Sequence, residues 1–427
     1  MNTIKTMLKG KLARNTGWMV LGQGLTFGMQ ALSFILLARL LGAHQYGVYV
    51  GAAAAVSMLA QYSSLGSGLV LIRHVSHNAE RFSDYWGNLI LVTMTLGLLI
   101  TFLLYVFGSV LIGPAGGAII VYVALSECTC ARIAEGAGQA FQAFEQLKLT
   151  AMLTTLTNLA RAITAAAMLL ILHTATVKQW AIASLIVSIF SAGISLYLVA
   201  SRLGKPKIDF SLIRDRAAEG FQFSFANSTA SAYNDLDKAM LSHYGMITAN
   251  GIYGTAYRVI DVVCAPIRSL QAAAFPRFCR LGREGLKGNA GLMFQVLRKT
   301  LPFSLGMGVL MLVCAPLVPR LLGKGFAESA SALRWLALLP VMRSIHLSTG
   351  SALTGAGYQR FRTGSQVFAA LLNFGLNLWL IPAYSWYGAA WSSLVTDGML
   401  AVINAIMFAW ILRRERTVSW RTEGLSC

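Results

Sequence analysis

Charged side chains are scarce in this 427-residue sequence. Only 12% of its residues are Asp, Glu, Lys or Arg, whereas 56% are hydrophobic, and the mean hydropathy is +0.62. Soluble domains carry about 25% charged residues. The chain therefore lacks the polar surface that a globular protein of its length needs, and its composition predicts an integral membrane protein.

Acidic residues and long hydrophilic segments are also few. The chain has 16 acidic residues against 35 basic ones, for a formal charge of +19. Most of the bases flank apolar segments, which is typical of topology signals, so we expect no nucleic acid partner. No hydrophilic stretch exceeds about 25 residues and no GxxxxGK[ST] occurs. The sequence therefore has no separate catalytic domain and no P-loop for ATP hydrolysis.

The cysteines do not form a metal-binding or disulfide pattern. There are six of them, and none is in a CxxC motif. Cys128 and Cys130 are two residues apart and point to different faces of a helix. We expect buried thiols, and we expect no metal site, no cofactor and no catalytic residues.

About twelve apolar segments account for most of the chain. A helix needs about 20 apolar residues to cross a bilayer, and prolines such as Pro302, Pro316, Pro319 and Pro340 are expected to bend or unwind some of them. The fourth, seventh and tenth segments are the least apolar. The predicted spans are 16–38, 47–71, 86–112, 117–144, 149–172, 180–200, 219–243, 251–275, 301–322, 332–354, 364–382 and 387–411.

The distribution of bases predicts the orientation. Twelve spans place both termini on one side, and that side carries 24 Lys and Arg residues, the other side five, and the spans themselves six. Because cytoplasmic loops are enriched in bases, both termini are expected in the cytoplasm.

Short motifs that are similar in the two halves of the chain predict an internal repeat. Gly42 with Tyr46-Gly47-Val48-Tyr49 opens the second span, and Gly245 with Gly251-Ile252-Tyr253 opens the eighth. A second pair of similar motifs lies at residues 138–144 and 357–361. A repeated six-span unit is typical of transporters with a site between the halves. The expected domains are a six-helix bundle over 1–204, a cytoplasmic linker over 205–218, and a second bundle with a basic tail over 219–427.

Polar side chains follow stripes on several spans. Span four carries its stripe within about 140° of arc at 100° per residue, and spans five, seven, eight and ten carry similar stripes. One interpretation is structural, because ion pairs and Ser, Thr and Asn contacts join helices in membranes. The number of striped spans favours a shared polar interior. The span-four stripe is Glu127, Arg132, Glu135, Gln139, Gln142 and Glu145.

The charges within the spans are formally balanced, with six bases and six acids. The spacing predicts three local pairs, Arg132–Glu135, Asp235–Lys238 and Arg258–Asp261. That pairing leaves three arginines over, and the planar guanidinium groups of these arginines could bind an anion. The residues expected to remain are Arg161, Arg268 and Arg343 against Glu127, Asp237 and Asp397.

Several short motifs carry a family resemblance. They are Leu36-Leu-Ala-Arg39-Leu-Leu-Gly42, Asp235-x-Asp237-Lys238, Gly251-Ile-Tyr253-Gly-Thr-Ala-Tyr257-Arg258 and Gly355-Ala-Gly357-Tyr358-Gln359. With them the chain resembles the polysaccharide-transport branch of the multidrug/oligosaccharidyl-lipid/polysaccharide exporter (MOP) superfamily, and more narrowly its O-antigen (Wzx-type) flippases. The resemblance covers essentially the whole chain.

The resemblance implies a fold and a function. The fold is an all-α membrane transporter with about twelve helices in two six-helix bundles that form a V, as in MATE transporters. The function is to flip a polyprenyl-diphosphate-linked oligosaccharide, such as an O-antigen, capsule or exopolysaccharide repeat unit, from the cytoplasmic to the periplasmic leaflet. The protein would lie in the bacterial inner membrane, with membrane lipid, a coupling H⁺ or Na⁺ and the polysaccharide polymerase machinery as partners.

The expected site residues follow from this cargo. Bases would bind the diphosphate, and neutral hydrogen-bonding groups would bind the sugars. The cavity residues are Arg132, Arg161, Arg258, Arg268, Arg343, Lys238, Asn158 and Gln139, and the candidates for ion coupling are Asp397, Glu127 and Asp235.

Two alternative functions stay open. A drug or cation antiporter of the same superfamily would have a cavity dominated by unpaired acids, whereas these spans hold as many bases as acids. A membrane polysaccharide polymerase or ligase would need a long periplasmic loop, whereas the longest outer segment, near 320–334, is short. The sequence therefore favours a transporter that is not an enzyme.

Overall fold

Helices form all the regular structure in the part of the chain that the structure describes. The computed structural model describes residues 2–282 and 285–423. Within these ranges the side chains of 2–23, 25–27, 230 and 416–423 are not described. No strand occurs in these residues, so the all-α prediction is confirmed. The predicted topology signals Lys5, Lys9, Lys11, Arg14, Arg283, Arg416 and Arg421, and the span-one residue Gln23, lie outside the described side chains.

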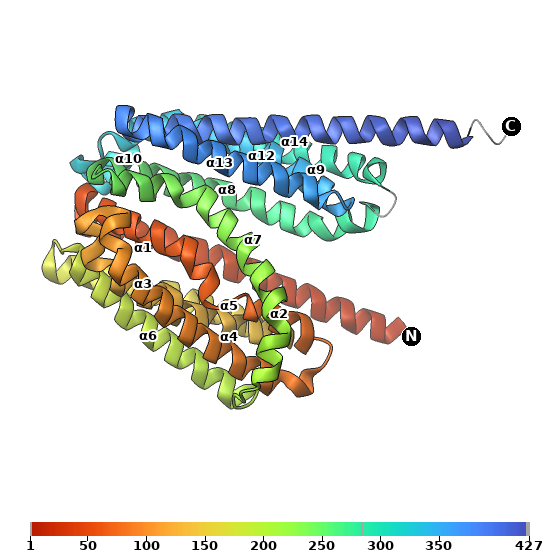
Figure 1. The fold of residues 1–427 in the computed structure, drawn as a ribbon, viewed down its shortest axis with the longest axis horizontal. Helices are drawn as coiled ribbons and strands as arrows, with labels where there is room; N and C mark the ends of the chain where they lie inside the picture. Colours follow the sequence, from red (N-terminus) through yellow and green to blue (C-terminus); the bar gives the residue numbers. More distant parts are fainter. Residues whose placement is uncertain (1, 283–284, 424–427) are drawn as a thin grey trace. The chain divides into compact units, whose positions relative to one another are not determined.

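The chain divides into two compact units, Met1–Gly251 and Ile252–Cys427, which we call the first and second units. The predicted division into 1–204 and 219–427 stays a prediction. Helices of the first unit are α1 (Asn2–Ser63), α2 (Ser67–Val75), α3 (Phe82–Ala124), the π-helical segment η2 (Leu125–Cys130), α4 (Ala131–Ala143), α5 (Leu147–Leu172), α6 (Val177–Arg202) and α7 (Phe210–His243) (Figure 1).

The helix α8 (Ile247–Leu281) begins in the first unit and continues into the second. The remaining helices of the second unit are α9 (Leu286–Cys314), α10 (Leu317–Leu322), α11 (Ser329–Trp335), α12 (Leu339–Gly355), α13 (Gln359–Tyr384) and α14 (Trp386–Glu423). Short 3₁₀ turns lie at Ala79–Arg81, Lys324–Phe326 and Leu336–Leu338.

Eight helical stretches of the described residues are long and apolar enough to cross a membrane. Two of them cover two predicted spans each: Ala79–Ala143 contains nearly all of 86–112 and 117–144, and Gly28–Ser63 contains parts of 16–38 and 47–71. The chain bends within these long helices at Gly42 (φ 67°) and Gly113 (φ 75°), where a positive φ favours glycine. The predicted spans 219–243 and 332–354 are not among the eight, and they were two of the three least apolar segments.

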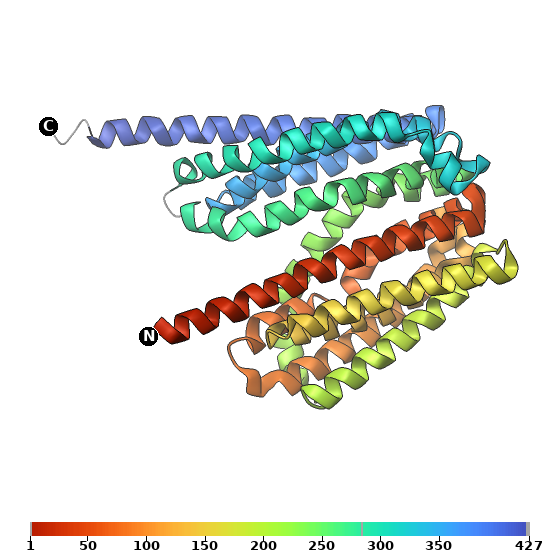
Figure 2. The same cartoon turned by 180° about the vertical axis from the view of Figure 1, so that it is seen from behind.

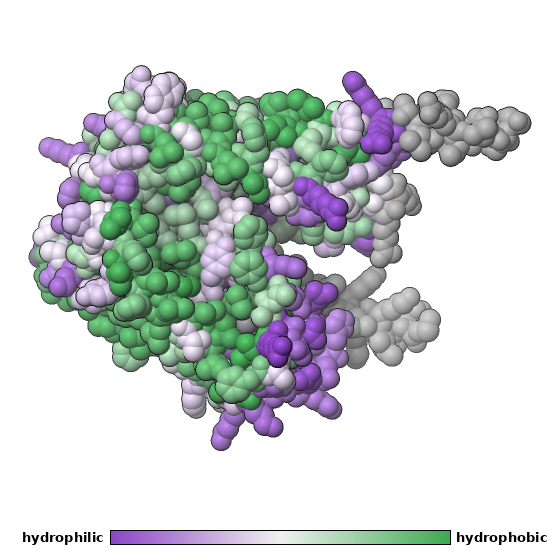
Figure 3. Space-filling view, in the orientation of Figure 1, coloured by the Kyte–Doolittle hydropathy of each residue, from purple (hydrophilic) through white to green (hydrophobic). Residues whose placement is uncertain are grey.

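The first unit packs around α1. This helix contacts α3, α5 and α7, and Figure 2 shows α5 running alongside it. The core between them uses small and β-branched side chains such as Ala52, Val56 and Ile120. Large apolar side chains such as Phe102 and Phe190 instead point outward, as the green surface of this unit shows (Figure 3). Outward apolar side chains are expected of helices that face lipid.

The segment before α7 is docked on α3. The Asn88 amide donates to the carbonyl of Asp209 and accepts from its N–H, both at 2.9 Å. Asp209 also caps α7, since its carboxylate accepts from the hydroxyl and N–H of Ser211 and from the N–H of Leu212. The Ser211 hydroxyl, these backbone donors and the Arg81 charge hold the pKa of Asp209 below its ordinary value.

A carboxylate from α14 caps α9 in the second unit. Glu415 accepts from the N–H groups of Leu286 and Lys287 at 3.0 and 3.1 Å, and from the Tyr358 hydroxyl at 3.0 Å. Burial, followed by this hydrogen bond, raises the pKa of Tyr358. The start of α9 is therefore held by a residue that is more than 100 positions away in the sequence.

Candidate functional site

A π-helical turn positions the first charged pair. Glu127 lies in η2, where the helix between α3 and α4 carries a wider turn. Its carboxylate contacts the Arg161 guanidinium of α5 at 2.9 Å, and Arg161 also donates to the Ser188 hydroxyl of α6 at 3.2 Å. Ser188 in turn lies 2.7 Å from the hydroxyl of Ser126. Turns of this kind often occur at functional sites.

Arg132, the second residue of α4, belongs to a separate group. It pairs with Glu135 at 2.7 Å, which confirms the predicted local pair, and it donates to Gln61 of α1 at 3.4 Å. Gln61 donates to Ser231 of α7 at 3.3 Å. The predicted stripe of span four assumed 100° per residue throughout, whereas the π-helical η2 lies between Glu127 and Arg132 and departs from that spacing. Glu127 pairs with Arg161, and Arg132 pairs with Glu135.

The end of the stripe is also corrected. Glu145 was expected on the polar face of span four, but α4 ends at Ala143. Glu145 lies in the following turn with φ of 56°, in the left-handed region. It therefore does not continue the polar face of α4.

A polar cavity of about 360 Å³ opens beside Arg132 and Glu135. Two buried polar atoms of its lining, Arg132 Nε and Ser224 Oγ, have no hydrogen-bond partner among the described residues. Buried polar groups nearly always have partners, so these two indicate a place for a polar ligand or water. The lining residues are Gln61, Ser64, Gly66, Gly68, Leu69, Leu89, Arg132, Glu135, Gly136, Gln139, Ser224 and Asn227.

Gln139 reaches this cavity because Gly68 leaves room for it. A Cβ at Gly68 would come within 1.6 Å of the Gln139 side-chain oxygen. Gln139 is a predicted site residue, whereas Gly68 and Gln61 are not among the predicted residues. The signal that would have found Gln61 is a single amide within an otherwise apolar span.

The third group of the first unit joins α1 to α7. Lys238 pairs with Asp235 at 2.7 Å, as predicted, and the other Asp235 oxygen accepts from Ser57 at 2.8 Å. Asn158 of α5 donates to the carbonyl of Thr154 within its own helix at 2.8 Å.

The second unit holds a buried network around Arg343 of α12. Its side chain is 6% exposed and donates to the Tyr257 hydroxyl at 2.8 Å. It also lies 3.6 Å from the Asp397 carboxylate and 3.4 Å from that of Asp261. His346 approaches the other Asp397 oxygen at 3.4 Å. Three helices, α8, α12 and α14, therefore meet around one guanidinium.

The three arginines expected to remain after local pairing each contact an acid, and two of these acids, Glu127 and Asp397, were expected to remain with them. Arg161 contacts Glu127, Arg343 contacts Asp397 and Asp261, and Arg268 contacts Asp261 at 3.7 Å. These pairs form between helices, or across seven residues within α8, where spacings of three or four residues do not identify them. Arg258 is exposed on α8, and its predicted pair with Asp261 stays a prediction.

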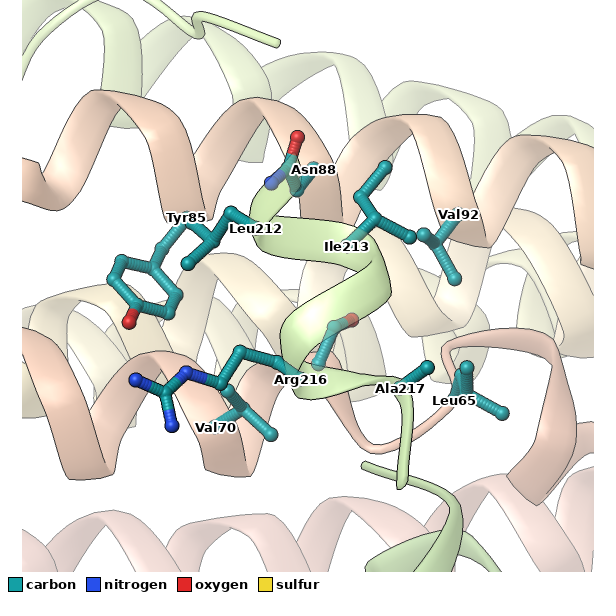
Figure 4. A pocket seen from close by; sticks show the side chains of 10 residues that line it. Leu65, Val70, Tyr85, Asn88, Val92, Leu212, Ile213, Arg216 and Ala217 are labelled. Carbon is teal, nitrogen blue, oxygen red and sulfur yellow. The ribbon is translucent and has the colours of Figure 1, made fainter. Parts of the chain in front are cut away.

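Another cavity of the first unit is apolar. It measures about 390 Å³ and lies among α2, α3 and the start of α7. Figure 4 shows Leu212, Ile213 and Val92 along it, with the Arg216 guanidinium and the Tyr85 ring on the same side. It contains none of the predicted site residues, so we do not include it in the candidate site.

Residues 12–281 match a family described as "Polysaccharide biosynthesis protein". The chain belongs to this family. A succinoglycan biosynthesis transport protein, ExoT of Rhizobium meliloti (strain 1021), is 24% identical over 421 residues, which cover 94% of this chain and 80% of the relative. The family match agrees with the resemblance drawn from the sequence motifs.

Solved transporter structures share the fold. An inward-facing multidrug resistance MATE transporter of the MOP superfamily has a TM-score of 0.74 at 14% identity and covers 92% of this chain and 96% of its own. A MOP transporter from Pyrococcus furiosus, described as having a binding pocket of reversed polarity, has a TM-score of 0.64 at 14% identity, with 94% and 96% covered. The chain is therefore a multi-pass membrane protein with a MATE-like fold, and at these identities the likeness concerns the fold alone.

Proposed function

We propose that this protein is a flippase that moves a polyprenyl-diphosphate-linked oligosaccharide from the cytoplasmic to the periplasmic leaflet of the bacterial inner membrane by alternating access. The observation that carries the proposal is the polar cavity of the first unit, where Arg132, Gln139 and Asn227 line a space within apolar helices. Family membership supports a role in polysaccharide synthesis, and the relative's description as a transport protein supports export.

The polar cavity has the chemistry that sugars require. Gln61, Gln139 and Asn227 provide amide donors and acceptors, and Ser224 and Arg132 add donors whose buried atoms have no partner among the described residues. Neutral hydrogen bonds contribute about 0.5–1.5 kcal/mol each, and bonds to charged groups about 1.5–3 kcal/mol. Several such bonds would offset the cost of removing a sugar from water.

The bases divide into two roles under this proposal. Arg258 and Arg268 are exposed on α8 and are the bases we assign to the diphosphate. Arg161, Arg343 and Lys238 are less exposed than Arg268 and each contacts an acid, so we assign them to holding the polar helices in register, with Asn158 beside α1. The first group is distinguished by its exposure, because an exposed guanidinium fork can reach a phosphate.

Ion coupling is assigned to the acids that hold these buried bases. Protonation of Asp397 would remove its attraction for Arg343 and His346, and protonation of Glu127 or Asp235 would do the same for Arg161 or Lys238. Each event would change the packing between helices that carry the polar groups. We therefore propose H⁺ as the first ion to test, with Na⁺ as the second.

A deletion strain tests the function. We expect its lipid-linked glycan to stay protected from a membrane-impermeant sugar oxidant applied to spheroplasts, and its surface polymer to be lost. Arg132→Gln should lower complementation about 10- to 100-fold, since it loses a charge-assisted hydrogen bond. Arg202→Gln, at the exposed end of α6, is the matched control. Normal export in the deletion strain would overturn the proposal.

A transport assay tests the coupling. In proteoliposomes, Asp397→Asn should remove the response of flipping to an imposed pH gradient, whereas Asp84→Asn, in the first turn of α3 and half-buried, should retain it. An Asp397→Asn variant with the full response would exclude Asp397 as the coupling group.

A further inference from the structure

A groove of about 650 Å³ lies between α8 and α9 in the second unit. Its floor is apolar and is formed by Leu270 and Ala274 of α8 with Leu292 and Val296 of α9. Ala274 and Val296 belong to the core of this unit, with Leu270 and Leu292 packed against it. The floor is thus part of a well-packed surface.

One base from each helix flanks this floor. Arg277 of α8 and Lys299 of α9 line the groove and are exposed. Within the described side chains neither forms an ion pair, and no carboxylate lines the groove. Two cations beside an apolar floor are complementary to an amphiphile with an anionic head.

The surrounding sequence extends this positive charge. Between residues 262 and 300 the chain has seven Lys and Arg residues and one acidic residue. Juxtamembrane clusters of bases attract anionic lipids of the cytoplasmic leaflet. The charge therefore favours an anionic occupant over a zwitterionic one.

The ends of two predicted spans place the groove near the membrane boundary. The predicted span on α8 ends at residue 275 and that on α9 begins at residue 301, and the groove lies between residues 270 and 277 and between 292 and 299. Long basic side chains at such positions extend toward the headgroups. The anionic group of the occupant should therefore lie at the depth of the lipid headgroups, and its apolar part should lie in the bilayer.

We propose that this groove binds an anionic glycerophospholipid of the surrounding bilayer. The phosphate lies between Arg277 and Lys299, and one acyl chain covers the floor formed by Leu270, Ala274, Leu292 and Val296. The site is separate from the residues assigned to the glycan cargo, so the proposal does not depend on flippase activity.

Binding of dioctanoyl phosphatidylglycerol to the purified full-length protein in detergent tests this site. Arg277→Gln combined with Lys299→Gln should weaken binding by about tenfold. Arg280→Gln combined with Arg298→Gln is the matched control, since it removes two exposed charges that do not line the groove, and its affinity should stay within about twofold of the wild type. Ala273→Trp, which fills the groove from an exposed position, should also weaken binding about tenfold.

Three results would overturn the proposal. Equal losses in the two charge variants would mean only diffuse attraction of anions. Unchanged binding in Ala273→Trp would mean that no acyl chain occupies the groove. A polyprenyl phosphate that binds tenfold more tightly than phosphatidylglycerol, and is lost in the same variants, would identify the occupant as the anchor of the cargo instead.

Discussion

The charged side chains within the helices of this protein hold one another in place. Arg343 and Asp397 are 5% and 1% exposed, and the guanidinium also contacts Tyr257 and Asp261. Removal of one partner of a buried pair leaves a charge without compensation. A buried base in these helices is therefore first a structural element, and its use in transport must act through the acids beside it.

Substitution of Arg343 tests this role. We expect Arg343→Ala to lower the free energy of unfolding by about 3–5 kcal/mol, because Asp397 stays buried without its cation. Arg268 is 46% exposed in its side chain and contacts Asp261, so Arg268→Ala should cost about 1 kcal/mol or less. Thermal unfolding of the purified protein in detergent would measure both, and equal effects would contradict the prediction.

A lysine at position 343 tests whether the shape of the guanidinium matters as well as its charge. Arg343→Lys keeps the charge but loses the planar fork that serves Tyr257, Asp261 and Asp397 together. Its stability should lie between those of the wild type and Arg343→Ala.

Close approaches between helices depend on glycine. The first turns of α8 cross α1 within the first unit, where a Cβ on Gly47 would come within 1.9 Å of the Ile247 carbonyl and 2.8 Å of the Gly251 nitrogen. The Asn250 amide donates to the Gly47 carbonyl at 3.1 Å across this crossing. Gly47 and Gly251 are the equivalent glycines of the predicted repeat, and they meet here. Small residues at such crossings are typical of membrane helices.

Gly47→Ala should therefore separate the two helices. Because the obstacle is backbone rather than a flexible side chain, we expect a loss of about 1–3 kcal/mol in stability. Gly193 of α6 has nothing within 4 Å of the position of its Cβ, so Gly193→Ala should be neutral or stabilising by up to about 1 kcal/mol. Thermal unfolding of the two variants in the same detergent measures the difference. A Gly47→Ala variant as stable as Gly193→Ala would show that the crossing adapts at no cost.

The π-helical segment is an element that hydropathy does not reveal. Residues Leu125–Cys130 follow the apolar run of α3 and include Ser126, Glu127 and Thr129, but nothing in their composition marks a wider turn. Glu127 within this turn pairs with Arg161 of α5, whereas Arg132 after it pairs with Glu135 beside the polar cavity. A helical wheel drawn at 100° per residue merges these two groups.

The predicted orientation of the whole protein in the membrane rests on its charge asymmetry. The predicted topology places Lys178 and Lys205 on opposite sides. They flank α6, whose 26 residues give a length of about 39 Å at 1.5 Å per residue. This length is sufficient to cross the hydrocarbon core of a bilayer.

Cysteine labelling tests this orientation. In a background with the native cysteines replaced, Lys178→Cys should react with a membrane-impermeant maleimide in cells with a permeable outer membrane. Lys205→Cys should react only after the inner membrane is opened. Both positions are exposed in the structure, so burial does not limit the reaction. The opposite pattern would contradict the predicted orientation.

Composition and periodicity determined the membrane class, the all-α fold, most of the spans and two local ion pairs, Arg132–Glu135 and Asp235–Lys238. These features depend on neighbours within about one turn or on the total apolar length of a segment, which a sequence displays directly. The two predicted spans that are not among the eight stretches, 219–243 and 332–354, lie on α7 and on α11 to α12. These helices carry polar side chains such as Asp235 and Arg343.

Only the tertiary structure decided three features. They are the acids that Arg161, Arg268 and Arg343 contact, the break in regular helical geometry at η2, and the polar cavity near Gly68. Each depends on contacts between helices, or on a departure from regular helical geometry, and a change of one residue in phase redirects every side chain that follows. Electrostatic pairing inside a membrane is strong and is satisfied by the nearest opposite charge in space. For this reason the sequence determined how many charges the helices carry, whereas the packing of the helices determined which charges meet.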